Sequence, residues 1–451
     1  MKRISILFLA VLTLASCAKQ EQPTKHPKFA YDATIFELNT RQLTPEGTFR
    51  AAEAELPKLK EMGVDIIWMM PLQPIGKLTR KGTLGSYYSI IDYCDFNPEF
   101  GTREDFEHFL AKAHELGMKV ILDWVANHTA PDSEWTRIDG WHYRDENGNL
   151  MVQYDWTDIS KLNYENEDMR AAMKEAMHFW MDEIGIDGFR CDVAGEVPTD
   201  FWNDVMSELR QTHPDMFTLA EDEDKAHELC ETAFDMYYGW TLHHLMNGVA
   251  QGTNSVQDLW DYFAKADTTV EDYAIRMNFI SNHDENSWSG DEYERMGAAV
   301  QAMTAFTYVI PGMPLIYTGQ EYGNHHRLQF FEKDCIDRDE NNPMRPLYKK
   351  LNDLRAANPA LHSPELGAKM LRLPTDNDKV FACVREAEVE KDQTNTVISF
   401  INMSNDPQDV TIDIDTFADD YTDFDGNSIE LESSQTCHLA PWQFIILTDR
   451  D

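Results

Sequence analysis

Eight short apolar segments alternate with helical ones between residues 34 and 317, and this alternation is the strongest constraint on the fold. The strand-like segments cover residues 34–38, 66–70, 119–123, 188–193, 218–220, 232–236, 276–280 and 315–317. Segments with helical periodicity lie between them, such as 49–62, 103–116, 167–184 and 199–212. Strands that alternate with helices form a parallel sheet. Eight such units predict a closed (β/α)8 TIM barrel, with its active site at the C-terminal ends of the strands.

Two further regions do not follow the alternation. Residues 129–166 contain no convincing helix and are rich in Trp, Tyr, Asp and Asn. A long irregular excursion within a compact domain is usually functional, so we expect a short lobe inserted after strand three. Beyond residue 366, short β-type runs separated by Asp, Asn and Gly predict a C-terminal antiparallel β-sandwich. The expected domains are therefore a barrel with its lobe over residues 30–365 and a sandwich over 366–451.

The first residues have the pattern of a targeting segment. Lys2 and Arg3 precede an apolar run over residues 4–14, which is too short to span a bilayer and indicates a signal peptide over 1–17. Its LASC ending resembles a bacterial lipobox, which implies that Cys17 becomes the lipidated first residue of the mature protein. The polar residues 18–29 would form a tether. We expect an exported lipoprotein anchored in the cell envelope, on the periplasmic side or at the cell surface.

Composition excludes some partners. A formal net charge of −40 argues against a nucleic acid and against adhesion of the protein surface to anionic lipid. The six cysteines after Cys17 are scattered and include no C-x-x-C pair, so they support neither a zinc site nor a dense disulfide framework. We expect mostly free, buried thiols.

Four of the predicted strands end in residues that carry chemistry. On strand four, Arg190 and Asp192 project from the same face, and a cation beside a carboxylate favours the ionised form that a nucleophile requires. Taken alone, each strand end would more often be a salt bridge, a turn or a helix N-terminus. Their occurrence in order favours one site, which gathers His128, Arg190, Asp192, Glu221, His283 and Asp284.

These four segments resemble the four signature regions of the α-amylase family of retaining glycoside hydrolases. The resemblance extends to GSYYSIIDYCDFNPEFGTREDF at 85–106, ISKLN at 159–163 and PLIYTGQEYG at 314–323. It implies that Asp192 is the nucleophile, Glu221 the general acid/base, and Asp284 the third carboxylate that holds sugar hydroxyls. It also implies that a set of groups surrounds the cleaved sugar: Arg190, His128 and His283, with Tyr88 as the aromatic platform.

Cleavage of a glycosidic bond needs two carboxyl groups that differ in pKa. One must bond to the anomeric carbon as a carboxylate, and the other must give a proton to the leaving oxygen. We expect Arg190 to lower the pKa of Asp192. We expect the apolar approach through Phe217 and Leu219 to raise that of Glu221.

Some positions depart from the family pattern or leave alternatives open. Gly195 and Glu196 stand where typical α-amylases have a Lys-His pair that contacts the leaving-side sugars, and we expect Glu196 to bind the substrate there. The VAGEV run instead resembles VANEV of the neopullulanase and cyclomaltodextrinase branch, which points to short maltodextrins or cyclodextrins.

Asn127 matches a position that often binds calcium, and the alternative is an Asn hydrogen-bonded within the lobe. Trp288 is our candidate for sugar stacking, against simple loop packing.

The sequence therefore predicts a lipid-anchored retaining hydrolase that cleaves α-1,4-glucosidic bonds in starch-derived maltodextrins by double displacement. The chemistry needs no cofactor, with calcium as a structural addition. One alternative is a transglycosylase or isomerase that uses the same intermediate. Another is a non-catalytic glycan-binding lipoprotein, but members that lose catalysis usually lose a carboxylate, and none is missing here.

Overall fold

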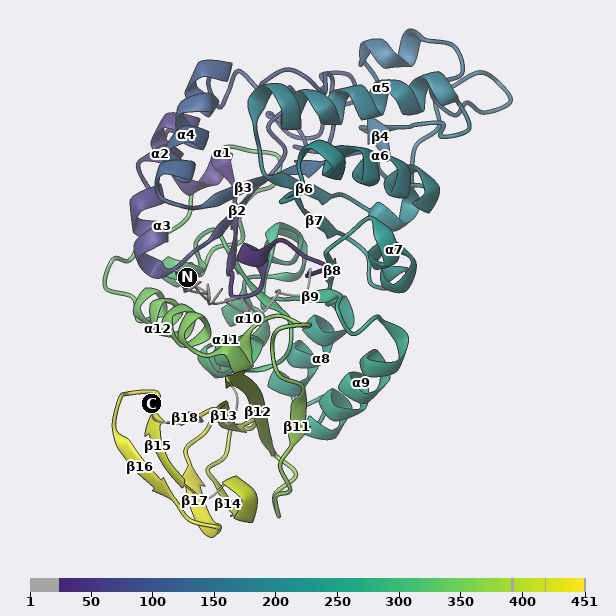
Figure 1. Cartoon of the computed structure of the whole chain (residues 1–451). Helices are drawn as coiled ribbons and strands as arrows, with labels where there is room; N and C mark the ends of the chain where they lie inside the picture. Colours follow the sequence, from purple (N-terminus) through teal and green to yellow (C-terminus); the bar gives the residue numbers. More distant parts are fainter. Residues whose placement is uncertain (1–23, 391–392, 418, 450–451) are drawn as a thin grey trace, which may run out of the picture.

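The computed structural model describes residues 24–390, 393–417 and 419–449, and its main domain is a closed barrel of parallel strands (Figure 1). The predicted signal peptide, Cys17 and the start of the tether lie outside these residues. Around the barrel the strand order is β1-β10-β9-β8-β7-β6-β3-β2. The strands are β1 (Ile35–Leu38), β2 (Ile66–Met69), β3 (Lys119–Trp124), β6 (Gly188–Cys191), β7 (Phe217–Ala220), β8 (Met236–Tyr238), β9 (Ile275–Asn278) and β10 (Met313–Tyr317). The predicted TIM barrel is confirmed.

The strands are almost wholly buried because both of their faces are covered. Side chains that point inward fill the barrel with a cluster that includes Ile35, Trp68, Ile121, Leu219 and Met277. Side chains that point outward pack against the helices in a second and larger cluster. The barrel is thus a packed core, and ligands can reach it only at its ends.

Helices cover the outside of the barrel (Figure 1). Several present one apolar face to it, whereas α11 is buried on nearly all sides. In α4, a capping box of Thr102 and Asp105 begins the helix, and Phe106, Phe109 and Ala113 recur at helical spacing on the buried face. The helices are α1 (Thr40–Leu43), α2 (Phe49–Glu53), α3 (Leu56–Met62), α4 (Arg103–Glu115), α5 (Glu167–His178), α6 (Thr199–Thr212), α7 (Ala226–Thr232), α8 (Trp240–Ala250), α9 (Val256–Thr269), α10 (Glu292–Met296), α11 (Val300–Val309) and α12 (Met344–Ala357).

Two predicted elements differ from the structure. The strand expected at 232–236 is wrong, because α7 continues to Thr232 and the barrel strand is β8. Just before β8, the carboxylate of Asp235 accepts hydrogen bonds from the backbone and hydroxyl of Thr218, which ties it to β7 instead of leaving it in a strand. The helix expected at 49–62 is broken into α2 and α3, because Pro57 fits the first turn of a helix and not its interior.

The lobe between β3 and α5 contains little regular structure. A short pairing of β4 (His128–Thr129) with β5 (Ser160–Lys161) closes its base, and a single 3-10 turn covers Glu134–Arg137. It projects near β4 at the upper right of Figure 1. The chain then returns through α5 and a π-helical turn, Phe179–Ile184, which ends at Gly185 with a left-handed backbone.

The C-terminal strands form two antiparallel sheets that share one core. The first has the order β11-β12-β13-β18-β15-β16, and the second pairs β14 with β17. Buried residues from both sheets, such as Val384, Phe400, Val410 and Leu439, belong to one cluster, as in the predicted sandwich. The strands are β11 (Met370–Arg372), β12 (Val380–Glu390), β13 (Gln393–Asn402), β14 (Gln408–Asp413), β15 (Asp419–Asp423), β16 (Ser428–Leu431), β17 (Ser434–Leu439) and β18 (Phe444–Asp449).

The described residues include neither a disulfide nor a membrane-crossing helix. Their six cysteines are free thiols: Cys191, Cys230 and Cys383 are buried, Cys94 is exposed, and the other two are partly exposed. Over residues 24–390, 393–417 and 419–449, no helix combines the length and the apolar character that crossing a bilayer requires.

We predict that Phe381→Ala will destabilise the protein by about 3–5 kcal/mol. The buried ring of Phe381, on β12, stacks on Trp260 of α9 at 4.3 Å and meets Phe306 of α11 edge-on at 4.9 Å, so it joins the C-terminal sheet to the barrel helices. Scanning calorimetry would measure the loss. Leu371→Ala on β11, where the side chain is 57 % exposed, is the matched control. Equal losses in the two variants would contradict a joining role.

Candidate active site

The register between two neighbouring strands brings Asp192 and Glu221 together. Cys191 of β6 pairs with Ala220 of β7, and each carboxylate is the next residue along its strand. The backbone amide of Glu221 donates to the carbonyl of Cys191 at 3.0 Å, and that of Ala194 donates to the carbonyl of Glu221 at 3.2 Å. Both carboxylates therefore lie at the C-terminal edge of the barrel.

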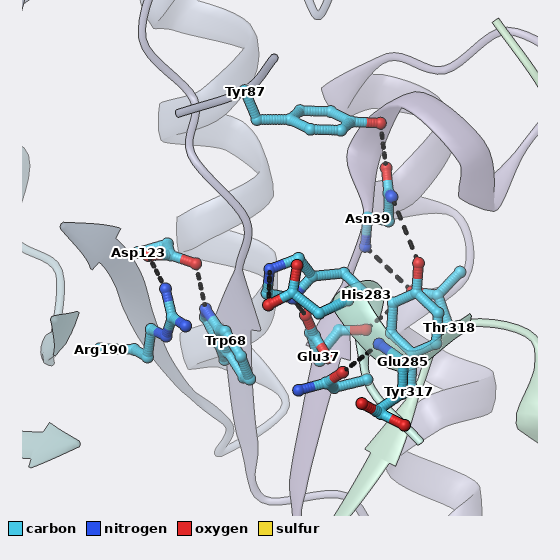
Figure 2. Close-up of polar contacts among 12 residues, drawn as sticks. Glu37, Asn39, Trp68, Tyr87, Asp123, Arg190, His283, Glu285, Tyr317 and Thr318 are labelled. Carbon is cyan, nitrogen blue, oxygen red and sulfur yellow. Dashed lines mark hydrogen bonds and ion pairs between the residues drawn. The ribbon is translucent and has the colours of Figure 1, made fainter. Parts of the chain in front are cut away.

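Arg190 is the charge around which this edge is built. Its guanidinium is fully buried and lies 2.8 Å from Asp123, 3.2 Å from Asp192 and 2.8 Å from Glu221 (Figure 2 shows the contact with Asp123). Its Nε also donates to the hydroxyl of Tyr238 at 3.1 Å. A buried cation must be paired to offset the loss of water. The three carboxylates that pair with Arg190 come from β3 and from the ends of β6 and β7. Asp123 serves here as a fixed buried partner.

Burial raises the pKa of both Asp192 and Glu221. For Asp192, burial acts most strongly, the negative charge of Glu221 adds to it, and Arg190 opposes it. For Glu221, burial again dominates over the lowering effect of Arg190. The direction expected for Glu221 is therefore right, and the lowered pKa expected for Asp192 is wrong. Arg190 shares its charge among three carboxylates, and at Asp192 and Glu221 it does not outweigh burial.

A strained backbone connects the two carboxylates. Val193, directly after Asp192, has φ 37° and ψ 50°, a left-handed conformation that β-branched residues rarely adopt. Its backbone amide donates to Glu221 Oε2 at 2.8 Å. Backbone strain of this kind costs about 1–3 kcal/mol and is found mainly at functional sites. Here it directs an amide at the carboxylate of the neighbouring strand.

Two histidines lie on opposite sides of this centre. His283 contacts Glu37 through Nδ1, and its Nε2 lies 2.8 Å from the hydroxyl of Tyr88 and 3.4 Å from Asp284. His128 is buried, and burial lowers its pKa to about 3, so its ring is neutral at ordinary pH. The first ring can carry positive charge, and the second can only form hydrogen bonds as a neutral group.

These residues line a cavity of about 500 Å3. Of the residues singled out in the sequence, seven line it, namely Tyr88, His128, Asp192, Glu221, His283, Asp284 and Trp288. Arg190 lies beneath them, buried. The indole of Trp288 is 55 % exposed and lies 5.4 Å from the ring of Phe330, so a flat apolar face remains open to a ligand.

The sequence reasoning missed several of the lining residues. Phe330 and Phe331 come from the irregular segment after β10, and Lys81 pairs with Asp158 at 3.1 Å across the cavity rim. An FF pair between polar residues, far from any predicted strand, was the available signal. The fully buried Glu37 was also missed, although it is the only charged residue in the apolar run IFEL.

A second cavity of about 380 Å3 adjoins the first. Val193 and Glu221 line both, so the two cavities meet at the acid/base candidate. The remaining lining of the second is mostly acidic and aromatic, namely Tyr154, Glu196, Asp222, Glu223, Asp224, Trp240, Thr241 and His244. A chain of sugars could pass from one cavity to the other beside Glu221.

Comparison with known families agrees with this geometry. Residues 37–138 and 136–407 match the family model described as Alpha amylase, catalytic domain, which is well over half of the chain. The chain belongs to the alpha-amylase family. This confirms the resemblance drawn from the four strand ends.

Individual alpha-amylase family members are similar at the level of sequence. Alpha-amylase MalA of Haloarcula japonica is 27 % identical over 409 residues, covering 86 % of this chain and 58 % of that protein. The alpha-1,4-glucan:maltose-1-phosphate maltosyltransferase 1 of Streptomyces coelicolor is 26 % identical over 413 residues, covering 82 % and 58 %. This chain thus spans less than two thirds of the length of these curated relatives.

Solved structures from the alpha-amylase family match over almost the whole chain. An alpha-amylase from Lactobacillus plantarum has a TM-score of 0.82 at 28 % identity, covering 94 % of this chain and all of that one. The noncanonic maltogenic alpha-amylase AmyB from Thermotoga neapolitana also has a TM-score of 0.82, at 27 % identity, covering 92 % and 98 %. The barrel, the lobe and the C-terminal sheets are therefore an arrangement that other members share.

Glu196, which we expected to bind the substrate, has partners within the protein. Its carboxylate accepts hydrogen bonds from Gln153 at 2.9 Å and Tyr154 at 2.6 Å, and Lys161 lies 3.8 Å away. The hydrogen bond from Tyr154 is the main cause that lowers the pKa of Glu196, so the group is ionised at neutral pH. These contacts fasten the lobe to the loop after β6. A contact between Glu196 and a sugar stays a prediction.

Calcium at Asn127 also stays a prediction. The side chain is buried, and its amide nitrogen lies 3.1 Å from Nδ1 of His128. Calcium takes six to eight oxygen ligands, often carboxylates. Among the residues that the structure describes, no group of three or more His, Cys, Asp or Glu is placed to hold a metal ion. The side chains near Asn127 thus support its role as a hydrogen-bonded lobe residue more than as a ligand.

We predict that Glu196→Ala will loosen the lobe without unfolding the barrel. Loss of about 1–2 kcal/mol of hydrogen bonding would speed amide exchange of residues 150–161 by about 5- to 30-fold, because local opening becomes easier. Hydrogen–deuterium exchange with mass spectrometry would measure this. Glu134→Ala, which removes an exposed lobe carboxylate paired only with Arg137, is the control and should leave the rate unchanged. Unchanged exchange in Glu196→Ala would contradict the fastening role.

Proposed function

We propose that this chain is a retaining glycoside hydrolase that cleaves α-1,4-glucosidic bonds in maltodextrins. The observation that carries the proposal is the pair Asp192 and Glu221, held by neighbouring strands at one cavity with Asp284 beside them. Membership in the alpha-amylase family supports the substrate class. Short maltodextrins or cyclodextrins are the expected substrates, given the VAGEV run at 193–197.

In this mechanism Glu221 transfers the proton, and Asp192 forms and then breaks a bond to the anomeric carbon. Glu221 gives its proton to the glycosidic oxygen while the carboxylate of Asp192 bonds to the anomeric carbon, which breaks the bond to the leaving sugar. Glu221 then takes a proton from water, whose oxygen displaces Asp192 and restores the original anomeric configuration. Burial raises the pKa of both groups, which favours retention of a proton by the pair.

The surrounding groups have separate tasks in the same mechanism. Asp284 and the imidazole of His283 would hold sugar hydroxyls as the ring flattens, and Tyr88 would lie against the ring face. Arg190 keeps the carboxylate side of the site in place from beneath. The neutral His128 would form a hydrogen bond with a sugar hydroxyl from the lobe side.

A transglycosylase is the second candidate, because one relative is named a maltosyltransferase. In that reaction a sugar hydroxyl replaces water as the acceptor. An acceptor would enter through the second cavity, where Glu196, Asp222, Glu223 and Asp224 gather negative charge. Such a lining repels phosphate, so it favours water or a neutral sugar over a phosphorylated acceptor.

We predict that Asp192→Asn and Glu221→Gln will each lower kcat/KM on maltooligosaccharides by at least about 10³-fold, because each removes a group that bonds or protonates in the transition state. New reducing ends would be counted over time, and proton NMR would follow the anomer formed first. Asp215→Asn, an exposed residue before the start of β7, is the control. Wild-type rates in either site variant would refute the mechanism, and early products longer than the substrate would identify a transglycosylase.

We also propose that the protein is an exported lipoprotein attached to a cell-envelope membrane through Cys17. The support is the sequence of the first 17 residues: two basic residues, an apolar run and the LASC ending. The polar residues that follow are long enough to separate a lipid from the barrel, which begins with β1 at Ile35. An anchored enzyme of this kind would act on glucans outside the cytoplasm.

We predict that Cys17→Ser will abolish lipid attachment. Cells grown with an alkyne fatty acid should label the wild-type protein in the membrane fraction, and the variant should lose the label and leave that fraction. Cys94→Ser, which changes an exposed cysteine of the barrel domain, is the matched control. Label retained in Cys17→Ser would contradict the proposed site.

A further inference from the structure

One buried charged side chain interrupts the apolar run of strand β1. Glu37 lies on β1 between Phe36 and Leu38 and is fully buried. Its Oε1 lies 2.5 Å from Nδ1 of His283, and its Oε2 has no hydrogen-bond partner in the described structure. Figure 2 shows the carboxylate beside the ring. Burying a carboxylate is costly, so a position that keeps one calls for an explanation.

The hydrogen bonds on the other side of the ring fix one of its protons. The hydroxyl of Tyr88 donates to Asp123 Oδ2 at 2.9 Å, and Arg190 donates to Asp123 Oδ1 at 2.8 Å. A tyrosine hydroxyl has a single proton, so its oxygen can only accept from His283 Nε2, which lies 2.8 Å away. Nε2 therefore carries a hydrogen.

The second nitrogen of the ring faces the carboxylate of Glu37. A proton between Nδ1 of His283 and Oε1 of Glu37 forms a hydrogen bond, whichever of the two atoms holds it. Without that proton, Nδ1 and Oε1 would both be acceptors and would repel each other. Burial raises the pKa of Glu37, and the charge of His283 is the main influence that lowers it. Glu37 thus gives Nδ1 a hydrogen-bond partner while Nε2 carries its hydrogen toward Tyr88.

We propose that Glu37 is a positioning residue for His283: it fixes the orientation of the ring and holds a proton at Nδ1, so that Nε2–H stays directed at the hydroxyl of Tyr88, with Asp284 3.4 Å from the same nitrogen. This inference rests on the proposed function for the identity of the sugar. The ring state itself depends only on contacts among the protein's own residues.

The charge state follows from the groups that surround the ring. Burial alone would lower the pKa of His283, but the charges of Asp284 and Glu37 outweigh it and raise the pKa to about 9, with Arg190 opposing. Tyr88 and its partner Asp123 face the ring from the other side. The imidazolium is therefore present at neutral pH and is lost as the pH rises through about 9. Without the charge of Glu37, this loss would begin at lower pH.

The test is to replace Glu37 by an uncharged residue of the same shape. In Glu37→Gln, an amide can still bond to Nδ1, but the negative charge is gone. NMR of protein with 15N-labelled histidine, with the His283 signal assigned through His283→Gln, would report both ring nitrogens. We expect the titration of His283 to move down by at least about one pH unit, and the alkaline limb of kcat/KM to move with it.

Controls separate this role from a merely structural one. Glu321→Gln removes another buried carboxyl group, which accepts from the amide of Gly319, and should move neither titration nor pH profile. Glu37→Asp keeps the charge at a longer distance and should give a smaller shift, which covers the case in which Glu37→Gln does not fold. An unchanged His283 titration in the folded variant would overturn the proposal. If the titration moves but the wild-type protein cleaves no glucan, only the proposed function fails.

Discussion

The buried charge of Arg190 is the constraint on which the catalytic edge of the barrel depends. Burial opposes that charge, yet the carboxylates of Asp123 and Glu221 raise the pKa of the guanidinium, so it stays ionised. Its partners come from β3, β6 and β7, and each is held within 3.2 Å. A cation with no route to water cannot release its partners without a large loss of free energy. The same contacts that stabilise the barrel edge therefore keep the carboxylates in place for a reaction.

The network contains more carboxyl groups than cations, and this imbalance is itself functional. Its carboxyl groups are Glu37, Asp123, Asp192, Glu221 and Asp284, against the cations of Arg190 and His283. Burial and the neighbouring negative charges raise the pKa of Asp192 and Glu221, so these two groups hold a proton more readily than they would in water. A glycosidase needs a proton for its leaving group, and this shift acts in the direction that keeps one. Arg190 opposes the shift at both groups.

Much of this site was predictable because its residues lie at or shortly after the ends of predicted strands. Apolar runs locate the strands, and parallel strands place their C-terminal ends at one edge of the barrel. Asp192, Glu221 and Asp284 come after three of these strands, so they could be assigned to that edge. Where the prediction failed, the deciding contact lay elsewhere in the chain. The pair Arg190 and Asp192 is local, but Asp123 and Glu221 take a share of the guanidinium, so the pKa of Asp192 rises instead of falling. No pattern within one strand contains that competition.

The same reason explains the residues that were missed or misplaced. Glu37 contacts His283, which lies 246 residues away in the chain. A single acidic residue in a short apolar run does not indicate which distant residue will be its buried partner. Residues 232–236 were expected to form a strand, but α7 ends at Thr232 and β8 begins only at Met236. Between them, Asp235 accepts hydrogen bonds from Thr218 of β7, a partner that lies outside the local sequence pattern. Phe330 and Phe331 reach the cavity from a segment without regular structure, where periodicity carries no information.

The position of the two central carboxylates is set by backbone and not by side-chain packing. The backbone N–H of Asp192 donates a hydrogen bond to the carbonyl of Trp124, and that of Glu221 donates to the carbonyl of Cys191, so each residue is anchored to the strand before it in the barrel. Loops such as the lobe around Tyr154 can therefore change without moving the reacting groups. The hydrogen bonds between strands therefore hold the two carboxylates, while the loops shape the cavity in front of them.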